Sequence, residues 1–123
     1  MKFFHEAEPG IFIATGCLQT EQDGCDWTVE YYELLAANRP LAVIVNVNDQ
    51  PEVAAGKPMV LWMKAHKAEL GRLIRVTVYI ADDDEERAEL ERSLPGRAKA
   101  LPYPAAIAAS EADALFLARA SLS

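Results

Sequence analysis

The stretch LAVIVNV, residues 41–47, decides the fold. It is an apolar run rich in β-branched residues, interrupted only by an Asn. A strand with one solvated face alternates apolar and polar residues, whereas a strand covered on both faces is almost continuously apolar. We therefore expect residues 41–47 to form a central strand that is buried on both faces.

The residues before this strand predict a β-hairpin and then a helix. Residues 2–8 and 11–18 have the composition of strands, and the Pro9-Gly10 pair between them is typical of a tight turn. A polar loop follows, and a helix is expected over residues 27–37 because apolar side chains recur there at intervals of three and four. The buried face of that helix is expected to consist of Trp27, Tyr31, Leu34 and Leu35.

A long loop and an amphipathic helix are predicted after the central strand. Residues 48–58 have the polar, Pro- and Gly-containing composition of a loop, and loops of this length often carry function. A helix is then expected from about Pro58 to Gly71. Its apolar stripe consists of Met59, Trp62, Met63, His66 and Leu70.

Residues 74–80, IRVTVYI, predict the next strand. Their alternation indicates that one face belongs to the core and that the other is partly covered. The core face is expected to hold Ile74, Val76, Val78 and Ile80. The acidic run 82–86 then predicts a helix whose first turn carries carboxylates, which the helix dipole favours. The Pro95-Gly96 pair is expected to end that helix.

The last segment predicts an edge strand and a final helix. Pro102 and Pro104 fall in the expected strand 98–105, and residues that lack an N–H group are tolerated in a ladder only at an edge. Ser110 is expected to cap the final helix. The buried face of this helix is expected to consist of Ala112, Leu115 and Phe116.

Together these elements predict a single α/β domain over residues 1–123. The expected order is ββαβαβαβα, with a mostly parallel sheet of about five strands, four helices and a β-hairpin at the N-terminus. No internal repeat or linker divides the sequence.

The charge pattern limits the classes of partner. The net charge is −7, with basic residues concentrated in 56–75 and acidic residues in 82–92. Duplex nucleic acid requires a clustered basic face, so nucleic acid is not an expected partner. No apolar stretch reaches the ~20 residues of a membrane span, and the N-terminus lacks a signal-peptide pattern. We expect a cytoplasmic protein in which Cys17 and Cys25 are free thiols.

Four stretches of the chain share the order and landmarks of one known family. They are GIFIATGCLQTEQD (10–23), LAVIVNVND (41–49), WMKAHKAELGRLIRVTVYIADD (62–83) and ALPYPAAIAASEADALFLARA (100–120). In these stretches the chain resembles the SpoIIAA-like proteins, which belong to the wider STAS group of anti-sigma-factor-antagonist domains. The resemblance implies a STAS-like α/β fold and a role in regulation through protein contacts.

One position departs from the pattern of that group. Sporulation-type STAS domains carry a phosphorylated Ser just after the central strand, whereas this chain reads NDQP over residues 48–51. No Ser or Thr lies between residues 47 and 59. The resemblance therefore implies the frame of a phosphorylation switch without the residue that is phosphorylated.

The first candidates for a pocket lie at the carboxyl end of the central strand. Asn46, Asn48 and Asp49 are there, together with Gly16 and Gln19 at the end of the neighbouring strand. Ligands of open α/β sheets bind outside such strand ends. The alternative is that these residues only turn the chain.

The helix after the loop offers a second group of candidates. Met59, Trp62 and Met63 either line an apolar ligand cavity or belong to the core, where Met and aromatic stripes are common. His66 is either a base or ligand at the rim of a cleft or a packed, hydrogen-bonded core residue. No catalytic residue, metal ion or cofactor is assigned.

Three functions remain open on the sequence alone. The missing catalytic motif and the family resemblance favour a non-enzymatic regulatory or protein-interaction domain, whose partner is a second copy in a homodimer or another protein. The Met and Trp stripe is compatible with a carrier of a small apolar, lipid-like molecule. The third function is an enzyme with an unrecognised site.

Overall fold

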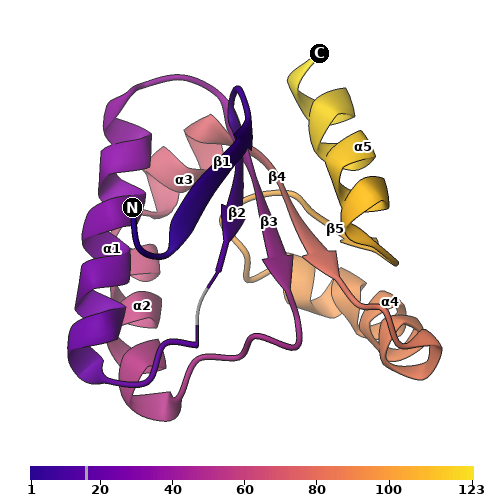
Figure 1. Cartoon of the computed structure of the whole chain (residues 1–123), viewed down its shortest axis with the longest axis horizontal. Helices are drawn as coiled ribbons and strands as arrows, with labels where there is room; N and C mark the ends of the chain where they lie inside the picture. Colours follow the sequence, from indigo (N-terminus) through magenta and orange to yellow (C-terminus); the bar gives the residue numbers. More distant parts are fainter. Residues whose placement is uncertain (16) are drawn as a thin grey trace.

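The predicted central strand lies in the middle of the sheet. A computed structural model describes residues 1–15 and 17–123, so Gly16, one of the pocket candidates, lies outside the described residues. The described strands follow one another in space as they do along the chain (Figure 1). They are β1 (Phe4–Glu8), β2 (Ile11–Ala14), β3 (Leu41–Asn46), β4 (Ile74–Ile80) and β5 (Ala105–Ala108). β1 and β2 are antiparallel and the other neighbours are parallel, which confirms the predicted sheet.

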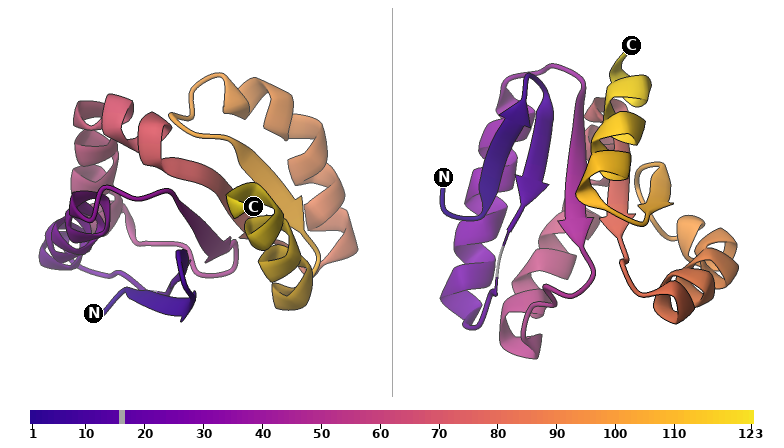
Figure 2. Two further views of the ribbon diagram at one scale, coloured as in Figure 1. Left: turned by 90° about the horizontal axis from the view of Figure 1, so that it is seen from above. Right: turned by 45° about the vertical axis from the view of Figure 1, so that its right-hand side comes forward.

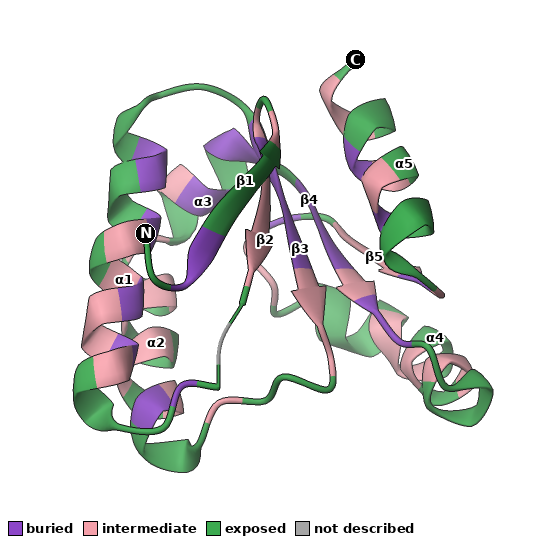
Figure 3. Ribbon diagram, viewed as in Figure 1, coloured by how far each residue is buried: buried purple, intermediate pink, exposed green. Residues whose placement is uncertain are grey.

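Five helices are present in the described part of the chain, one more than the four expected. They are α1 (Glu21–Ala36), α2 (Val53–Ala65), α3 (Lys67–Leu73), α4 (Asp84–Ala98) and α5 (Glu111–Leu122). The order is therefore ββαβααβαβα. Helices α1, α2 and α3 cover one face of the sheet and α5 covers the other (Figure 2). Most of β3 is therefore buried, as predicted (Figure 3).

The extra helix arises because the predicted helix 58–71 is divided at His66. The backbone of His66, at φ −114 and ψ 26, ends α2, and α3 begins at the next residue. The backbone N–H and the ring Nδ1 of His66 both approach the carbonyl oxygen of Trp62, at 3.0 and 2.9 Å. The ring nitrogen thus shares a carbonyl of the last turn of α2 with the backbone N–H, as basic side chains do near helix C-termini.

The predicted start of α2 at Pro58 is wrong. The helix begins at Val53, and the loop after β3 is correspondingly shorter than the expected 48–58. A proline inside a helix removes one backbone donor. Here the ring of Pro58 packs toward Gly24 of α1, so the residue contributes to the contact between the two helices.

Two other helices also extend beyond their predicted limits. α1 begins before the expected residue 27 because Thr20 and Asp23 form a reciprocal capping box. Its predicted buried face is confirmed: Trp27, Tyr31, Leu34 and Leu35 are all buried. α4 continues through Pro95 and Gly96 instead of ending there.

A bulge in β4 changes the predicted assignment of its faces. Leu41 pairs with Ile74 and Ala42 pairs with Val76, so Arg75 is the extra residue and points to solvent. Ile74 consequently joins the core beneath α1 and α3, not the face of Val76, Val78 and Ile80. The prediction of one continuous face is therefore wrong at Ile74.

α5 presents a different face to the sheet from the one predicted. Ala114 and Ala118 are fully buried, whereas Ala112 and Phe116 are exposed and Leu115 is half-buried. Small side chains allow the helix to lie close to β3 and β4. The large ring of Phe116 is therefore turned toward solvent.

The two edges of the sheet are short or irregular strands. β5 is an edge strand, as predicted, but it begins after Pro102 and Pro104 instead of including them. At the other edge, a bulge between Glu6 and Glu8 shifts the register of β1 on β2. Glu8 also accepts a hydrogen bond from Nε of Arg119 at 2.8 Å, which connects this edge to α5.

Gly24 of α1 is expected to be intolerant of a larger side chain. A Cβ at this position would lie 2.2 Å from the carbonyl oxygen of Ala55 and 2.7 Å from Cγ of Pro58. Gly24→Ala should therefore lower the free energy of unfolding by about 1–3 kcal/mol, the usual cost of overpacking. Urea denaturation measures this change.

Gly56→Ala is the matched control for that substitution. Gly56 lies in α2, and a Cβ there meets no other atom within 4 Å. Because Ala favours the helix over Gly, this variant should be more stable than the wild type by up to about 1 kcal/mol. Equal effects of the two substitutions would contradict the close contact between α1 and α2.

Candidate functional site

An apolar cavity of about 130 Å³ lies between the sheet and helices α1 and α2. β3 and β4 supply its floor through Val43, Val45 and Thr77. Tyr103, from the segment before β5, contributes a further wall. Aromatic and Met side chains cover it from the helices: Trp27 and Tyr31 from α1, and Met59 and Met63 from α2.

The outer side of this cavity lies at the carboxyl ends of β2 and β3. Thr15 follows β2, and Asp49 and Pro51 belong to the loop after β3. The Asp49 N–H donates to the carbonyl oxygen of Asn46 at 3.0 Å, which turns the chain at this point. Ligands of open α/β sheets bind at this end of the strands, so the cavity lies where the fold favours a site.

Tyrosine hydroxyls supply much of the polarity around the cavity. Burial raises the pKa of both Tyr31 and Tyr103. Burial also raises the pKa of Tyr79, whose hydroxyl lies 3.4 Å from that of Tyr103. These phenols therefore stay protonated near neutral pH and act as neutral hydrogen-bonding groups.

Sequence reasoning and structure agree on part of the lining. The cavity includes three of the predicted candidates: Asp49, Met59 and Met63. Trp62 lies behind them, with ring centroids 6.0 Å from Trp27 and 5.3 Å from Tyr31. The structure therefore brings the two Met residues to the cavity and places Trp62 in the aromatic cluster that supports it.

His66 lies outside the cavity, at the junction of α2 and α3. Its ring stacks on Trp62 with 4.6 Å between centroids and meets Tyr32 edge-on at 5.7 Å. The contact of Nδ1 with the carbonyl oxygen of Trp62 requires a proton on Nδ1, because a carbonyl only accepts. The half-buried ring is thus packed and hydrogen-bonded, an arrangement that favours a structural role.

Asn46 and Asn48 organise the loop after β3 instead of lining the apolar cavity. Oδ1 of Asn46 accepts from the backbone N–H of Asn48 at 2.9 Å. Nδ2 of Asn48 donates to Oδ1 of Asp82 at 3.4 Å, which connects the loops that follow β3 and β4. Asn46 borders a separate hollow of about 400 Å³ toward the start of α5.

Sequence reasoning missed Thr77, Tyr79 and Tyr103. The polar residues of the segment 74–80 predict a face of β4 that is only partly covered. Thr77 lies on that face but is buried, which the sequence did not show. Tyr103 stands between two prolines, in the segment for which the sequence predicts an edge strand. A tyrosine flanked by prolines close to a strand is a weak signal, and only the fold brings it over β4.

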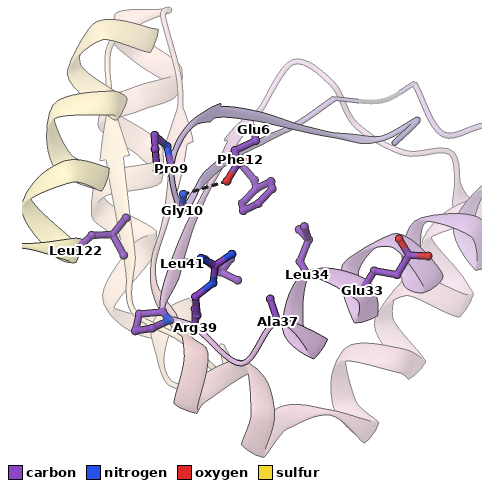
Figure 4. Close-up of a pocket in the computed structure, with 11 residues that line it drawn as sticks. Glu6, Pro9, Gly10, Phe12, Glu33, Leu34, Ala37, Arg39, Leu41 and Leu122 are labelled. Carbon is purple, nitrogen blue, oxygen red and sulfur yellow. Dashed lines mark hydrogen bonds between the residues drawn. The ribbon is translucent and has the colours of Figure 1, made fainter.

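A larger hollow of about 430 Å³ lies at the opposite end of the sheet, around the hairpin turn (Figure 4). Gly10, Phe12, Leu34 and Arg39 are among its lining residues. Arg39 is exposed to solvent, and the Glu6 carboxylate accepts from the Gly10 N–H at 3.2 Å. These polar groups are solvated or paired, so the hollow does not require a ligand and the smaller cavity is the stronger candidate.

The buried tyrosines should lower stability at alkaline pH. Their pKa values in the folded protein lie above the value near 10 of an exposed tyrosine. The unfolded chain therefore releases phenol protons first, and the free energy of unfolding should fall as the pH rises above about 10. Below that pH these groups should contribute no pH dependence.

Phenolate absorbance tests this directly. The titration curve of the native protein should lag behind that of the chain unfolded in urea. Coincident curves would contradict the burial of Tyr31, Tyr79 and Tyr103.

Comparison of the chain with protein-family models, with curated proteins and with solved structures found no match. Among residues 1–15 and 17–123, no helix combines the length and the apolar character that crossing a bilayer requires. The structure itself shows an α/β fold in which an N-terminal β-hairpin is part of a mixed five-stranded sheet.

Proposed function

We propose that this chain is a non-enzymatic binding domain of SpoIIAA-like type that holds a small apolar molecule between its sheet and helices α1 and α2. The observation that carries the proposal is the apolar cavity of about 130 Å³. A dry cavity of roughly 150 Å³ in another protein is large enough to bind benzene. The cavity therefore fits a molecule the size of one aromatic ring or a short hydrocarbon chain.

The lining of the cavity supports this use. Val43 and Val45 form a stiff floor in the central strand, whereas Met59 and Met63 have flexible, polarisable side chains that adapt to different shapes. Pockets for small molecules combine such apolar walls with a few placed polar groups. Here those groups are Thr77 and Tyr103.

The position of His66 also favours binding over catalysis. Its Nδ1 proton is committed to the Trp62 carbonyl, and its ring is stacked on Trp62. Nε2 keeps its lone pair in this tautomer, but a general base must also lie within reach of the reacting group, and His66 does not line the cavity. His66 instead supports the aromatic cluster that covers the cavity.

Toluene is a suitable probe of the proposed site. At ten times its dissociation constant, a ligand of the folded state alone stabilises the protein by about 1.4 kcal/mol. Toluene should therefore raise the melting temperature of the wild-type protein. Val45→Phe, which fills the cavity from its floor, should abolish this rise.

Val53→Phe is the matched control. Val53 is 86% exposed on α2, so the same substitution there leaves the cavity intact and the toluene response should persist. A wild-type protein that toluene does not stabilise, or equal responses of the two variants, would overturn the proposal.

A second candidate function is protein interaction through a homodimer, which the family resemblance also implies. The observation that favours it is the outward face of α2, where Val53, Val60 and Leu61 are exposed at 86%, 52% and 65%. These residues are spaced to lie on one side of the helix, together with Lys57 and Lys64. Apolar side chains gathered on one exposed face are typical of an interaction surface.

Light scattering of the purified protein tests this second function. The wild type should have the mass of a dimer, and Leu61→Glu should convert it to a monomer by placing a charge in the interface. Phe116→Glu is the control, because Phe116 is 68% exposed on α5, on the other side of the sheet. A monomeric wild type, or dissociation by both variants, would exclude an α2-mediated dimer.

A further inference from the structure

Thr77 is a buried polar residue in an otherwise apolar core. It is 2% exposed, and its Oγ1 has no hydrogen-bond partner among the described residues. Leaving a buried hydroxyl unpaired costs about 1–3 kcal/mol, so such a group calls for an explanation. Thr77 is one of the residues that line the apolar cavity, which indicates where a partner for the hydroxyl would be.

The register of the sheet places Thr77 on the floor of that cavity. Thr77 pairs with Val43 on β3 and with Ala105 on β5, and Val43 is part of the core beneath α1. The Thr77 hydroxyl is near enough to that of Tyr103 to lower the pKa of the phenol slightly against the larger effect of burial, but the two hydroxyls do not meet the distance and angle criteria of a hydrogen bond. Tyr103 in turn contacts the hydroxyl of Tyr79 at 3.4 Å. The cavity therefore has a polar corner at its floor, in addition to Thr15 and Asp49 at its outer side.

We propose that Thr77 and Tyr103 make this cavity selective for a ring-sized apolar molecule that carries one hydroxyl or carbonyl group. This inference rests on the proposed binding function. A ligand hydroxyl would donate to Oγ1 of Thr77 and accept from the phenol of Tyr103, and a carbonyl would accept from either group. The hydrocarbon part would remain against Met59 and Met63.

Phenol and toluene are matched probes of this selectivity, because they differ only in a hydroxyl and a methyl group. Thr77→Val removes the hydroxyl of Thr77 and keeps its branched shape, and Thr77→Ser keeps the hydroxyl. Dissociation constants are measured for both probes by NMR titration. Thr77→Val should weaken phenol binding about three- to tenfold, the effect of one neutral hydrogen bond, and leave toluene binding unchanged or stronger. Thr77→Ser should retain the preference of the wild type.

The outcomes separate this inference from the function on which it rests. If the wild type binds neither probe, the proposed binding function itself fails. If toluene binds but Thr77→Val leaves the ratio of the two dissociation constants unchanged, the binding function stands and the selectivity is overturned.

The stability of the ligand-free variant provides a second readout. If the Thr77 hydroxyl is unpaired, Thr77→Val should raise the urea midpoint. If the hydroxyls of Thr77 and Tyr103 instead satisfy each other, Thr77→Val should lower the midpoint, and this result would contradict the inference.

Discussion

The central strand β3 stays out of water only if both faces of the sheet are covered, and the rest of the molecule depends on this constraint. The strands follow one another in sequence order, so right-handed crossovers place the intervening helices on a common face. The other face of the sheet is covered by α5. Its Ala114 and Ala118 allow the helix to approach the sheet closely and exclude water with small side chains.

The face beneath α1 and α2 is covered differently, by large rings. Five ring pairs among Phe4, Trp27, Tyr31 and Trp62 have centroids 5.0 to 6.0 Å apart. Such aromatic pairs contribute about 0.5–1.5 kcal/mol each beyond the burial of their area. Rings from three elements hold the helices at a distance from β3 and β4. The cavity is the space that remains between this aromatic cluster and the floor of the sheet.

Several features of the fold could be predicted from the spacing of apolar residues and from the turn residues. They are the hairpin, the central position of β3 and the buried face of α1. The sequence also predicts an edge strand near the C-terminus, but over residues 98–105, of which only Ala105 belongs to β5. Asp49, Met59 and Met63 were identified as pocket candidates because strand ends and Met stripes are recognisable in a sequence. The bulge at Arg75 was not predictable from alternation, since it depends on how β4 aligns with Leu41. The face of α5 depends on how closely the helix approaches the sheet.

The candidate site was less predictable than the fold, because it joins residues from separate elements. Thr77 and Tyr103 meet only after β5 has taken its place beside β4. The division at His66 likewise lies in the backbone conformation of a single residue, φ −114 and ψ 26. Pairwise contacts of this kind leave no period in the sequence, so composition and spacing do not reveal them.

The irregular edges of the sheet determine how this protein can associate. An open edge offers unpaired backbone groups to another chain, which is a common route to aggregation. Here one edge carries the bulge at Glu6 and Glu8 with a carboxylate held by Arg119, and the other is a strand of four residues preceded by prolines. Neither edge is a good template for adding a strand. Contacts with another chain are therefore expected to use the helical surfaces rather than an added strand.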